Sequence, residues 1–147
     1  MSHRILVVDE ELAIGFALGE YFTLRGYEVD CAVAVKEAQA LLRRGSYGAL
    51  ITDLSFSSGR GAEGLELAVF VRRENPGTRT VILTAYGSAE MEAEARRLGV
   101  DAFLHKPTPL GQIARVLDRV LQAPDSRGGA GHPSGDPPAA EPIRSGL

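Results

Sequence analysis

Cysteine is almost absent from this chain. Its one cysteine, Cys31, excludes an intrachain disulfide, as expected in a reducing compartment. Long apolar runs are missing too, since no stretch approaches the ~20 residues that cross a bilayer. The apolar run that begins at Ile5 is also too short for a signal peptide. We therefore expect a cytoplasmic protein that makes no contact with membranes.

An excess of positive charge is also absent. The formal net charge of −3 at pH 7 gives no electrostatic reason to expect nucleic-acid binding. Lysine is scarce, because only Lys36 and Lys106 of the 16 Lys and Arg residues are lysine. In a chain that fills its basic positions with arginine, a lysine in a reactive place carries extra weight.

Short apolar runs alternate with longer helical stretches along the chain. We predict strands at residues 5–8, 27–32, 49–52, 80–84 and 102–104, and helices at residues 11–25, 35–44, 62–75, 88–98 and 110–122. Ile5-Leu-Val-Val8 is a continuous aliphatic run, typical of a strand buried on both faces of a parallel sheet. Five β–α units in a row predict an α/β fold, with a doubly wound parallel sheet covered by helices on both faces.

The composition changes after Ala123. Ten of the last 24 residues are Pro or Gly, and only Ile143 and Leu147 are large aliphatics. Such a segment cannot bury enough apolar surface to offset the entropy of ordering it. We therefore predict one folded domain over residues 1–123 and a disordered tail over residues 124–147.

Reactive side chains follow the predicted strands. In open parallel sheets such groups gather beyond the carboxyl ends of the strands. The residues in these positions are Asp9, Glu10, Glu11, Asp53, Thr84, Lys106 and Pro107. Several carboxylates, a hydroxyl and an ammonium thus converge on one edge of the fold.

This set of groups has a coherent chemistry. Clustered carboxylates repel each other unless a cation lies among them, and an all-oxygen ligand set suits Mg²⁺. A carboxylate beside Mg²⁺ can attack a phosphoryl group and form an aspartyl phosphate. The metal and a lysine then neutralise phosphoryl oxygens, while a hydroxyl donates to another. The sequence has no Walker loop at Gly59-Arg-Gly61, because the Lys and Ser/Thr that would follow are missing.

Four motifs in order resemble the receiver domain of bacterial two-component response regulators, over residues 3 to about 122. Ile5-Leu-Val-Val-Asp-Glu10 resembles its first strand and acidic pair, and Ile51-Thr-Asp-Leu54 its phosphoacceptor strand. Leu83-Thr-Ala85 resembles its switch hydroxyl, and Phe103-Leu-His-Lys-Pro107 its aromatic–Lys–Pro signature. Each motif alone is weak, but the four at the family's spacing are specific. The resemblance implies a flavodoxin-like (β/α)5 fold, with a five-stranded parallel sheet in the order 2-1-3-4-5.

The resemblance also implies which residues hold the phosphoryl group and the metal. Asp53 matches the phosphoacceptor. Asp9 and Glu10 match the acidic pair that holds Mg²⁺, with Asp53 and the backbone carbonyl of Ser55 as the other protein ligands.

The remaining matches concern the switch. Thr84 matches the hydroxyl that moves toward the phosphoryl group, and Phe103 the aromatic that turns inward with it. Lys106 matches the lysine that grips a phosphoryl oxygen, and its bond to Pro107 is expected to be cis.

The segment after the acceptor departs from the family pattern. The family often places Met-Pro soon after the acceptor, whereas this chain continues Ser55-Phe-Ser-Ser-Gly-Arg-Gly-Ala-Glu-Gly64, which looks about three residues longer. The longer loop could be mobile, so that water reaches the acyl phosphate, or Arg60 could fold over the site as a second cation. The acidic pair is Asp-Glu instead of the commoner Asp-Asp, a change that the family tolerates.

Two apolar features have alternative explanations. Gly15 and Gly19 lie four residues apart in the first predicted helix, where each costs ~1 kcal/mol against alanine. The third predicted helix is apolar nearly all round and includes Val69 and Phe70. Either feature could be a surface for a partner or ordinary core packing.

The combined prediction is a response regulator receiver domain of a phosphorelay. It would accept a phosphoryl group from a sensor histidine kinase or a histidine phosphotransfer protein, and then present a switched surface to an unknown protein target. Beyond its own phosphorylation and dephosphorylation we expect no enzyme activity, and a homodimer is left open.

Two alternatives belong to other functional classes. A receiver-like scaffold that works without phosphorylation would not need the Asp/Glu, Asp, Thr and Lys set, which is intact here. An aspartyl-phosphate phosphatase of similar fold would need a second Asp two residues after the nucleophile, where this chain has Ser55.

Overall fold

The computed structural model describes residues 3–56 and 63–123. The predicted tail, residues 124–147, and the middle of the predicted long loop, residues 57–62, lie outside this range. The predictions about the tail and about Arg60 therefore stay predictions.

The centre of the protein is a five-stranded sheet in which all neighbouring strands are parallel. The strands are β1 (Arg4–Val8), β2 (Glu28–Ala32), β3 (Ala49–Thr52), β4 (Arg79–Thr84) and β5 (Ala102–His105). Their order is β2-β1-β3-β4-β5. Both the predicted doubly wound α/β fold and the strand order implied by the resemblance are confirmed.

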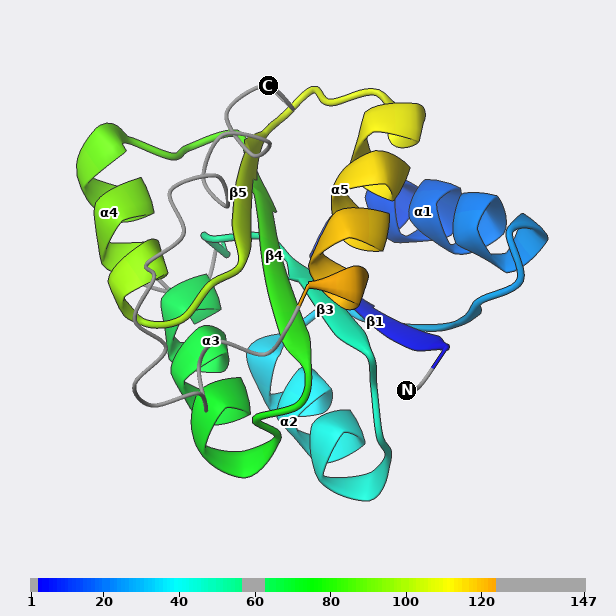
Figure 1. Cartoon of the computed structure of the whole chain (residues 1–147), viewed down its shortest axis with the longest axis horizontal. Helices are drawn as coiled ribbons and strands as arrows, with labels where there is room; N and C mark the ends of the chain where they lie inside the picture. The colour runs from blue at the N-terminus through cyan, green and yellow to red at the C-terminus, as the bar shows by residue number, and fades with distance from the viewer. Residues whose placement is uncertain (1–2, 57–62, 124–147) are drawn as a thin grey trace.

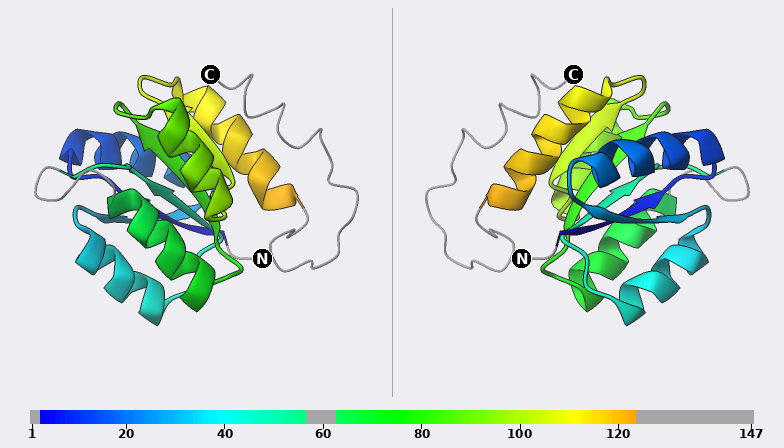
Figure 2. Two further views of the ribbon diagram at one scale, coloured as in Figure 1. Left: turned by 90° about the vertical axis from the view of Figure 1, so that its left-hand side faces the viewer. Right: turned by 90° about the vertical axis from the view of Figure 1, so that its right-hand side faces the viewer.

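Five helices cover the two faces of the sheet (Figures 1 and 2). They are α1 (Leu12–Leu24), α2 (Val35–Arg44), α3 (Glu63–Glu74), α4 (Ala89–Arg97) and α5 (Leu110–Gln122). Helices α1 and α5 pack on one face, and α2, α3 and α4 pack on the other. None of these helices is long and apolar enough to cross a membrane, within the part of the chain that the structure describes.

Strand β1 shows why a central strand is aliphatic along its fully buried length. Its residues alternate between two cores, with Ile5 and Val7 facing α1 and α5, and Leu6 and Val8 facing α2 and α3. Because successive side chains point to opposite faces, a strand covered on both sides must be apolar at every position. Each of these four residues is at most 1% exposed.

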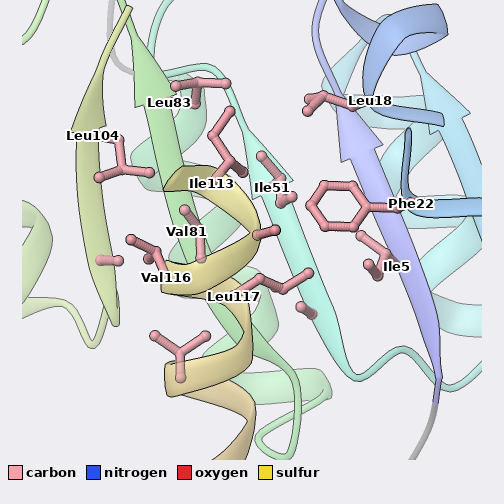
Figure 3. Packing of buried hydrophobic residues seen from close by; sticks show 14 of the residues in the cluster. Ile5, Leu18, Phe22, Ile51, Val81, Leu83, Leu104, Ile113, Val116 and Leu117 are labelled. Atoms are coloured by element: carbon pink, nitrogen blue, oxygen red, sulfur yellow. The ribbon is translucent and has the colours of Figure 1, made fainter. Parts of the chain in front are cut away.

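The core under α1 and α5 is one continuous hydrophobic cluster (Figure 3). Helix α5 places Ile113, Val116 and Leu117 against the strands, at the i, i+3, i+4 spacing of an amphipathic helix. Leu18 and Phe22 of α1 fill the same layer beside Ile5 and Ile51 (Figure 3). This packing fixes α5 over the middle of the sheet, so the β5–α5 connection lies at the strand ends.

Glycine ends two of the helices as the sequence predicts. Gly26 and Gly99 have φ of +98° and +97°, a left-handed conformation that glycine adopts without steric cost. The element boundaries agree with the predicted ones to within one residue, including the start of α4. There Ser88 lies outside the helix and caps it, because its hydroxyl accepts a hydrogen bond from the Met91 N–H at 3.1 Å.

The apolar character of α3 is explained by packing. Phe70 is only 6% exposed, lies in the core with Phe56 and Leu67, and has the Arg43 guanidinium 5.0 Å from its ring centroid. Val69, its neighbour, is half-buried. The idea that Phe70 forms an exposed docking face is therefore wrong, because α3 is held between the sheet and α2.

Phe70→Ala should lower the free energy of unfolding by about 3 kcal/mol or more, since the side chain leaves a cavity in a packed core. The matched variant Val69→Ala should cost less than about 1 kcal/mol. Urea denaturation of both variants measures the difference. Equal losses for the two would contradict the placement of Phe70.

Candidate functional site

The side chains predicted to act together follow strands β1, β3, β4 and β5 at one edge of the sheet. The backbone ladder continues just past the strands and sets these positions. Asp53 N–H donates to the Val8 carbonyl at 2.9 Å, and Lys106 N–H donates to the Thr84 carbonyl at 2.8 Å. Asp9 N–H likewise donates to the Ala32 carbonyl at 3.1 Å. The site is thus built on the rigid sheet and not on free loops.

The Lys106 ammonium lies between the two buried carboxylates. Its Nζ is 2.7 Å from Asp9 Oδ2 and 3.2 Å from Asp53 Oδ2. It also lies 3.6 Å from Glu11 Oε1. Asp9 and Asp53 are only 4% and 7% exposed, so one cation offsets two largely desolvated anions.

The other oxygen of Asp53 is held by the backbone. Asp53 Oδ1 accepts hydrogen bonds from the Leu54 N–H at 2.6 Å and the Ser55 N–H at 3.4 Å. Asp9 Oδ1 is held in a similar way by the Glu11 N–H at 2.9 Å. Both carboxylates are therefore oriented before any ligand arrives.

The protonation properties follow from burial and charge. Burial raises the pKa of Asp9 above its ordinary value, although the hydrogen bond from Lys106 works in the opposite direction. Burial alone would lower the pKa of Lys106, but the hydrogen bond and charge of Asp9, with the charge of Asp53, outweigh it and raise that pKa. Lys106 therefore stays protonated at neutral pH and supplies a fixed positive charge.

A cavity of about 630 Å³ opens beside these groups. Its lining consists of Glu10, Glu11, Asp53, Ser55, Phe56, Ala85, Tyr86 and Lys106. The cavity is large enough for a phosphoryl group, and it brings Glu10 and Ser55 to the same space as Asp53.

The donor set suits a small divalent cation. Two buried carboxylates and the nearby Glu10 and Glu11 carry more negative charge than Lys106 can offset. No three His, Cys, Asp or Glu side chains form a ready metal cluster in residues 3–56 and 63–123. Mg²⁺ does not require one, because it keeps several waters and often takes only one or two carboxylates. Asp9, Glu10 and Asp53, with the Ser55 carbonyl, are the residues that could hold it.

The two residues predicted to take part in the switch, Thr84 and Phe103, are both buried. Thr84 is fully buried and its Oγ1 accepts a hydrogen bond from the Tyr86 N–H at 3.2 Å. Phe103 is also fully buried, in the core beneath α3 and α4. The Lys106–Pro107 peptide bond is cis.

Two contributing residues, Gly64 and Gly87, were missing from the predicted site, and Glu11 was placed at this edge without a role. Glu11 forms an ion pair with Lys106. Gly64 packs against the backbone of the acceptor, since a Cβ there would overlap the Asp53 carbonyl oxygen and lie 2.8 Å from Leu54 Cα. Gly87 covers the Phe103 ring, which a Cβ would approach to 2.5 Å. In the sequence, only the position of Gly64 near the start of the third predicted helix pointed to one of these contacts.

Comparison with known proteins identifies this arrangement. Residues 5–118 match the family model of the response regulator receiver domain. The chain belongs to the response regulator receiver domain family. It is thus a signalling domain of two-component systems and not a classical enzyme.

Relatives of this receiver domain include proteins of several kinds. The response regulator protein PilR of Pseudomonas aeruginosa is 32% identical over 121 residues, which make up 81% of this chain but only 26% of PilR. Sporulation initiation phosphotransferase F of Bacillus subtilis is 26% identical over 121 residues, 82% of this chain and 95% of that protein. The chain therefore matches a small part of some relatives and nearly the whole of others.

A solved structure shows the chemistry in a relative. A response regulator of Burkholderia pseudomallei has a TM-score of 0.73 and 27% identity, over 86% of this chain and 71% of that one. Its structure contains a phosphorylated aspartic acid, a calcium ion and citrate.

Gly64→Ala should disturb the acceptor, because the added methyl group must displace the backbone at Asp53. We expect a loss of about 2 kcal/mol or more in the free energy of unfolding. Gly77→Ala is the matched control, since a Cβ there meets nothing within 4 Å. Thermal denaturation compares them, and an unchanged melting temperature for Gly64→Ala would show that the contact is not tight.

Lys106→Met should destabilise the protein by about 3 kcal/mol at pH 7, because two buried carboxylates lose their cation. Without the cation the pKa of Asp9 rises further, so the folded variant binds protons more tightly than the unfolded chain. The loss should thus shrink as the pH falls toward 4 and be complete above neutrality. Mg²⁺ should restore part of it.

Denaturant titrations at several pH values, with and without Mg²⁺, test this expectation. Lys36→Met removes the other lysine, which is exposed, and should show neither dependence. A loss for Lys106→Met that is the same at pH 4 and pH 8 would contradict the role of charge.

Proposed function

We propose that this receiver domain accepts a phosphoryl group on Asp53 and uses it to switch a protein-binding surface. One observation carries the proposal. The Asp53 carboxylate is oriented by backbone N–H groups on one oxygen and faces the Lys106 ammonium with the other, beside a cavity lined by further acids. The phosphorylated aspartic acid in the Burkholderia pseudomallei relative supports the same chemistry.

In the proposed reaction, an Asp53 oxygen attacks the phosphorus atom and the bond from phosphorus to the donor breaks. The donor's leaving group takes the electron pair, and a carboxylate attacks directly, without the proton removal that a hydroxyl or thiol nucleophile needs. This explains why the site needs no general base. Catalysis then rests on positioning and charge.

The residues around Asp53 divide these tasks. Lys106 neutralises a phosphoryl oxygen as the negatively charged phosphoryl group is transferred to Asp53. Mg²⁺, held by Asp9, Glu10, Asp53 and the Ser55 carbonyl, would screen the remaining oxygens. The N–H groups that hold Asp53 Oδ1 keep the carboxylate in line with the donor.

Thr84 and Phe103 would carry the change to the surface. Thr84 is held by the Tyr86 N–H, and a phosphoryl oxygen offers its hydroxyl a stronger, charged acceptor. A shift of Thr84 toward Asp53 would move the segment that contains Gly87, which lies on the Phe103 ring. Phe103 is fully buried, so this movement would change how its ring packs against Gly87.

The proposed phosphodonor is a sensor histidine kinase or a histidine phosphotransfer protein. Phosphotransferase F, which the chain matches over 95% of that protein's length, supports a role in phosphoryl transfer between proteins. The output would be an altered contact with a protein target or with a second copy of the chain.

Incubation with acetyl phosphate and Mg²⁺ should add one phosphoryl group to the full chain, and hydroxylamine should remove it because it is an acyl phosphate. Asp53→Asn should abolish the addition, whereas the control Asp118→Asn, which changes an acid on α5 near Arg25, should leave it unchanged. Intact mass spectrometry measures all three proteins.

Removal of Mg²⁺ with EDTA should slow the reaction at least about tenfold, as expected when a metal neutralises the transferred group. Undiminished phosphorylation of Asp53→Asn would show that another residue is the acceptor. An equal rate in EDTA would remove the metal from the proposal while leaving the acceptor in place.

A further inference from the structure

Most of the large exposed apolar side chains of the described residues lie on α1 or directly after β2. The large hydrophobic residues that are exposed are Leu12, Phe16, Leu24, Val33 and Tyr86. Tyr86 borders the phosphoacceptor cavity. The other four lie on α1 or directly after β2, and α1 faces the viewer in the right-hand part of Figure 2. A cluster of this kind marks an interaction surface more often than scattered residues do.

A groove of about 450 Å³ runs between α1 and β2 within this cluster. Gly15 and Gly19 lie where the helix faces the strand, and a Cβ on either would lie 3.6 or 3.9 Å from Cys31 Sγ. Phe16 lines one side of the groove and Val29 the other. The two glycines thus leave open a space that ordinary side chains would fill. We call it the α1–β2 groove.

The floor of the groove ends at an open strand edge. Strand β2 is the last strand of the sheet and pairs only with β1 among the described strands. Glu28 N–H donates to His3, and the Ala32 carbonyl accepts from Asp9, so residues 28 and 32 direct their backbone groups toward β1. By the alternation of a β-ladder, Val29 and Cys31 direct theirs outward. Such an edge can accept another extended segment.

The charge around the groove is negative. Glu20 lines it from α1, and the Glu28 side chain is 81% exposed on β2. Burial, followed by the charges of Asp30 and Glu37, raises the pKa of the Cys31 thiol. The nearest described cation on this strand pair, Arg4, already forms ion pairs with Glu28 and Asp30. An incoming segment with positive charge would therefore complement the rim.

The same charges argue against a second copy of this chain as the occupant. If the β2 strands of two copies paired in an antiparallel way, centred on Asp30, Asp30 of one copy would lie opposite Asp30 of the other. Glu28 of each copy would lie near this pair of acids. Like charges directly opposite each other destabilise strand pairing, and charged residues on edge strands prevent self-association.

We propose that the α1–β2 groove binds an extended, basic segment of a partner protein. The segment adds to the outer edge of β2, places its apolar side chains over Gly15 and Gly19, and pairs its basic side chains with Glu28 on the opposite face of the sheet. Alternation of apolar and basic residues satisfies both requirements, since successive side chains of a strand point to opposite sides. The site lies apart from Asp53 and does not require phosphorylation.

The test uses the full-length, ¹⁵N-labelled protein and a blocked peptide of alternating lysine and valine as the probe. NMR should show shifts at Gly15, Gly19, Val29 and Cys31, with a Kd of about 1 mM or tighter. The amide hydrogens of Val29 and Cys31 should exchange more slowly with solvent when the peptide is bound. Raising the salt from about 0.05 to 0.3 M should weaken binding severalfold, because the charged pairs are exposed.

Matched peptides and variants separate the contributions. A glutamate–valine peptide should not bind, and N-methylation of the lysine–valine backbone should abolish binding because the strand hydrogen bonds are lost. Glu28→Lys should weaken binding at least about threefold, and Gly19→Leu should block the groove. If Gly19→Leu does not fold, the change in peptide binding of Glu28→Lys still tests the proposal. Asp53→Asn should bind as the wild type does.

Several results would overturn the proposal. Equal binding of the two charged peptides would show that charge does not select the partner, and no shifts with the lysine–valine peptide at several millimolar would show that the groove does not take a strand. Sedimentation that shows a dimer, abolished by Glu28→Lys, would identify a second copy as the occupant. Slow exchange at Val29 and Cys31 without peptide would place another part of the same chain there.

Discussion

The Lys106 ammonium between the Asp9 and Asp53 carboxylates is the interaction on which the site depends. Two acids that are 4% and 7% exposed would repel strongly without a cation, since burial removes the water that normally screens them. Lys106 is separated from Asp9 by 97 positions in the sequence and from Asp53 by 53 positions. These contacts can therefore form only when β1, β3 and β5 have the correct order and register. Folding of the sheet and assembly of the reactive site are one event.

The same sheet explains why chemistry occurs at one edge while the rest of the interior is apolar. Along the buried part of the central strands, alternate residues pack into the two cores. The reactive polar groups lie where the strands end and the backbone still donates hydrogen bonds, as Leu54 N–H does to Asp53 and Tyr86 N–H does to Thr84. Phe103 belongs to the core but lies two residues from His105, at the end of β5. A change at the site thus meets a packed interior that responds in discrete steps.

The sequence predicted the sheet, its helices and the strand-end residues, because hydrophobic periodicity and turn residues are local signals. Contacts between distant segments were not predictable in this way. The role of Gly64 depends on how α3 meets Leu54, and Glu11 looks like any acid at the start of a helix. Phe16 and Phe70 both lie in helices rich in apolar residues, yet one is 68% exposed and the other 6%. The difference is topological: α3 packs against α2, whereas α1 overhangs the sheet edge formed by β2.

The short path between the phosphoacceptor site and α1 limits how strongly they can influence each other. Asp9 Oδ1 accepts from the Glu11 N–H, and the Glu11 carbonyl in turn accepts from Ile14 and Gly15. A change of partners at Asp9 can therefore reach the first turn of α1 through one hydrogen bond to a charged acceptor, worth about 1.5–3 kcal/mol. A ligand shifts an equilibrium only by its difference in affinity for the two states, so this route couples the sites by no more than the part of that energy that changes between the states. The Phe103 route runs through the opposite face of the sheet. Phosphorylation should thus act mainly on the α4 side, leaving the α1–β2 groove a nearly constant surface.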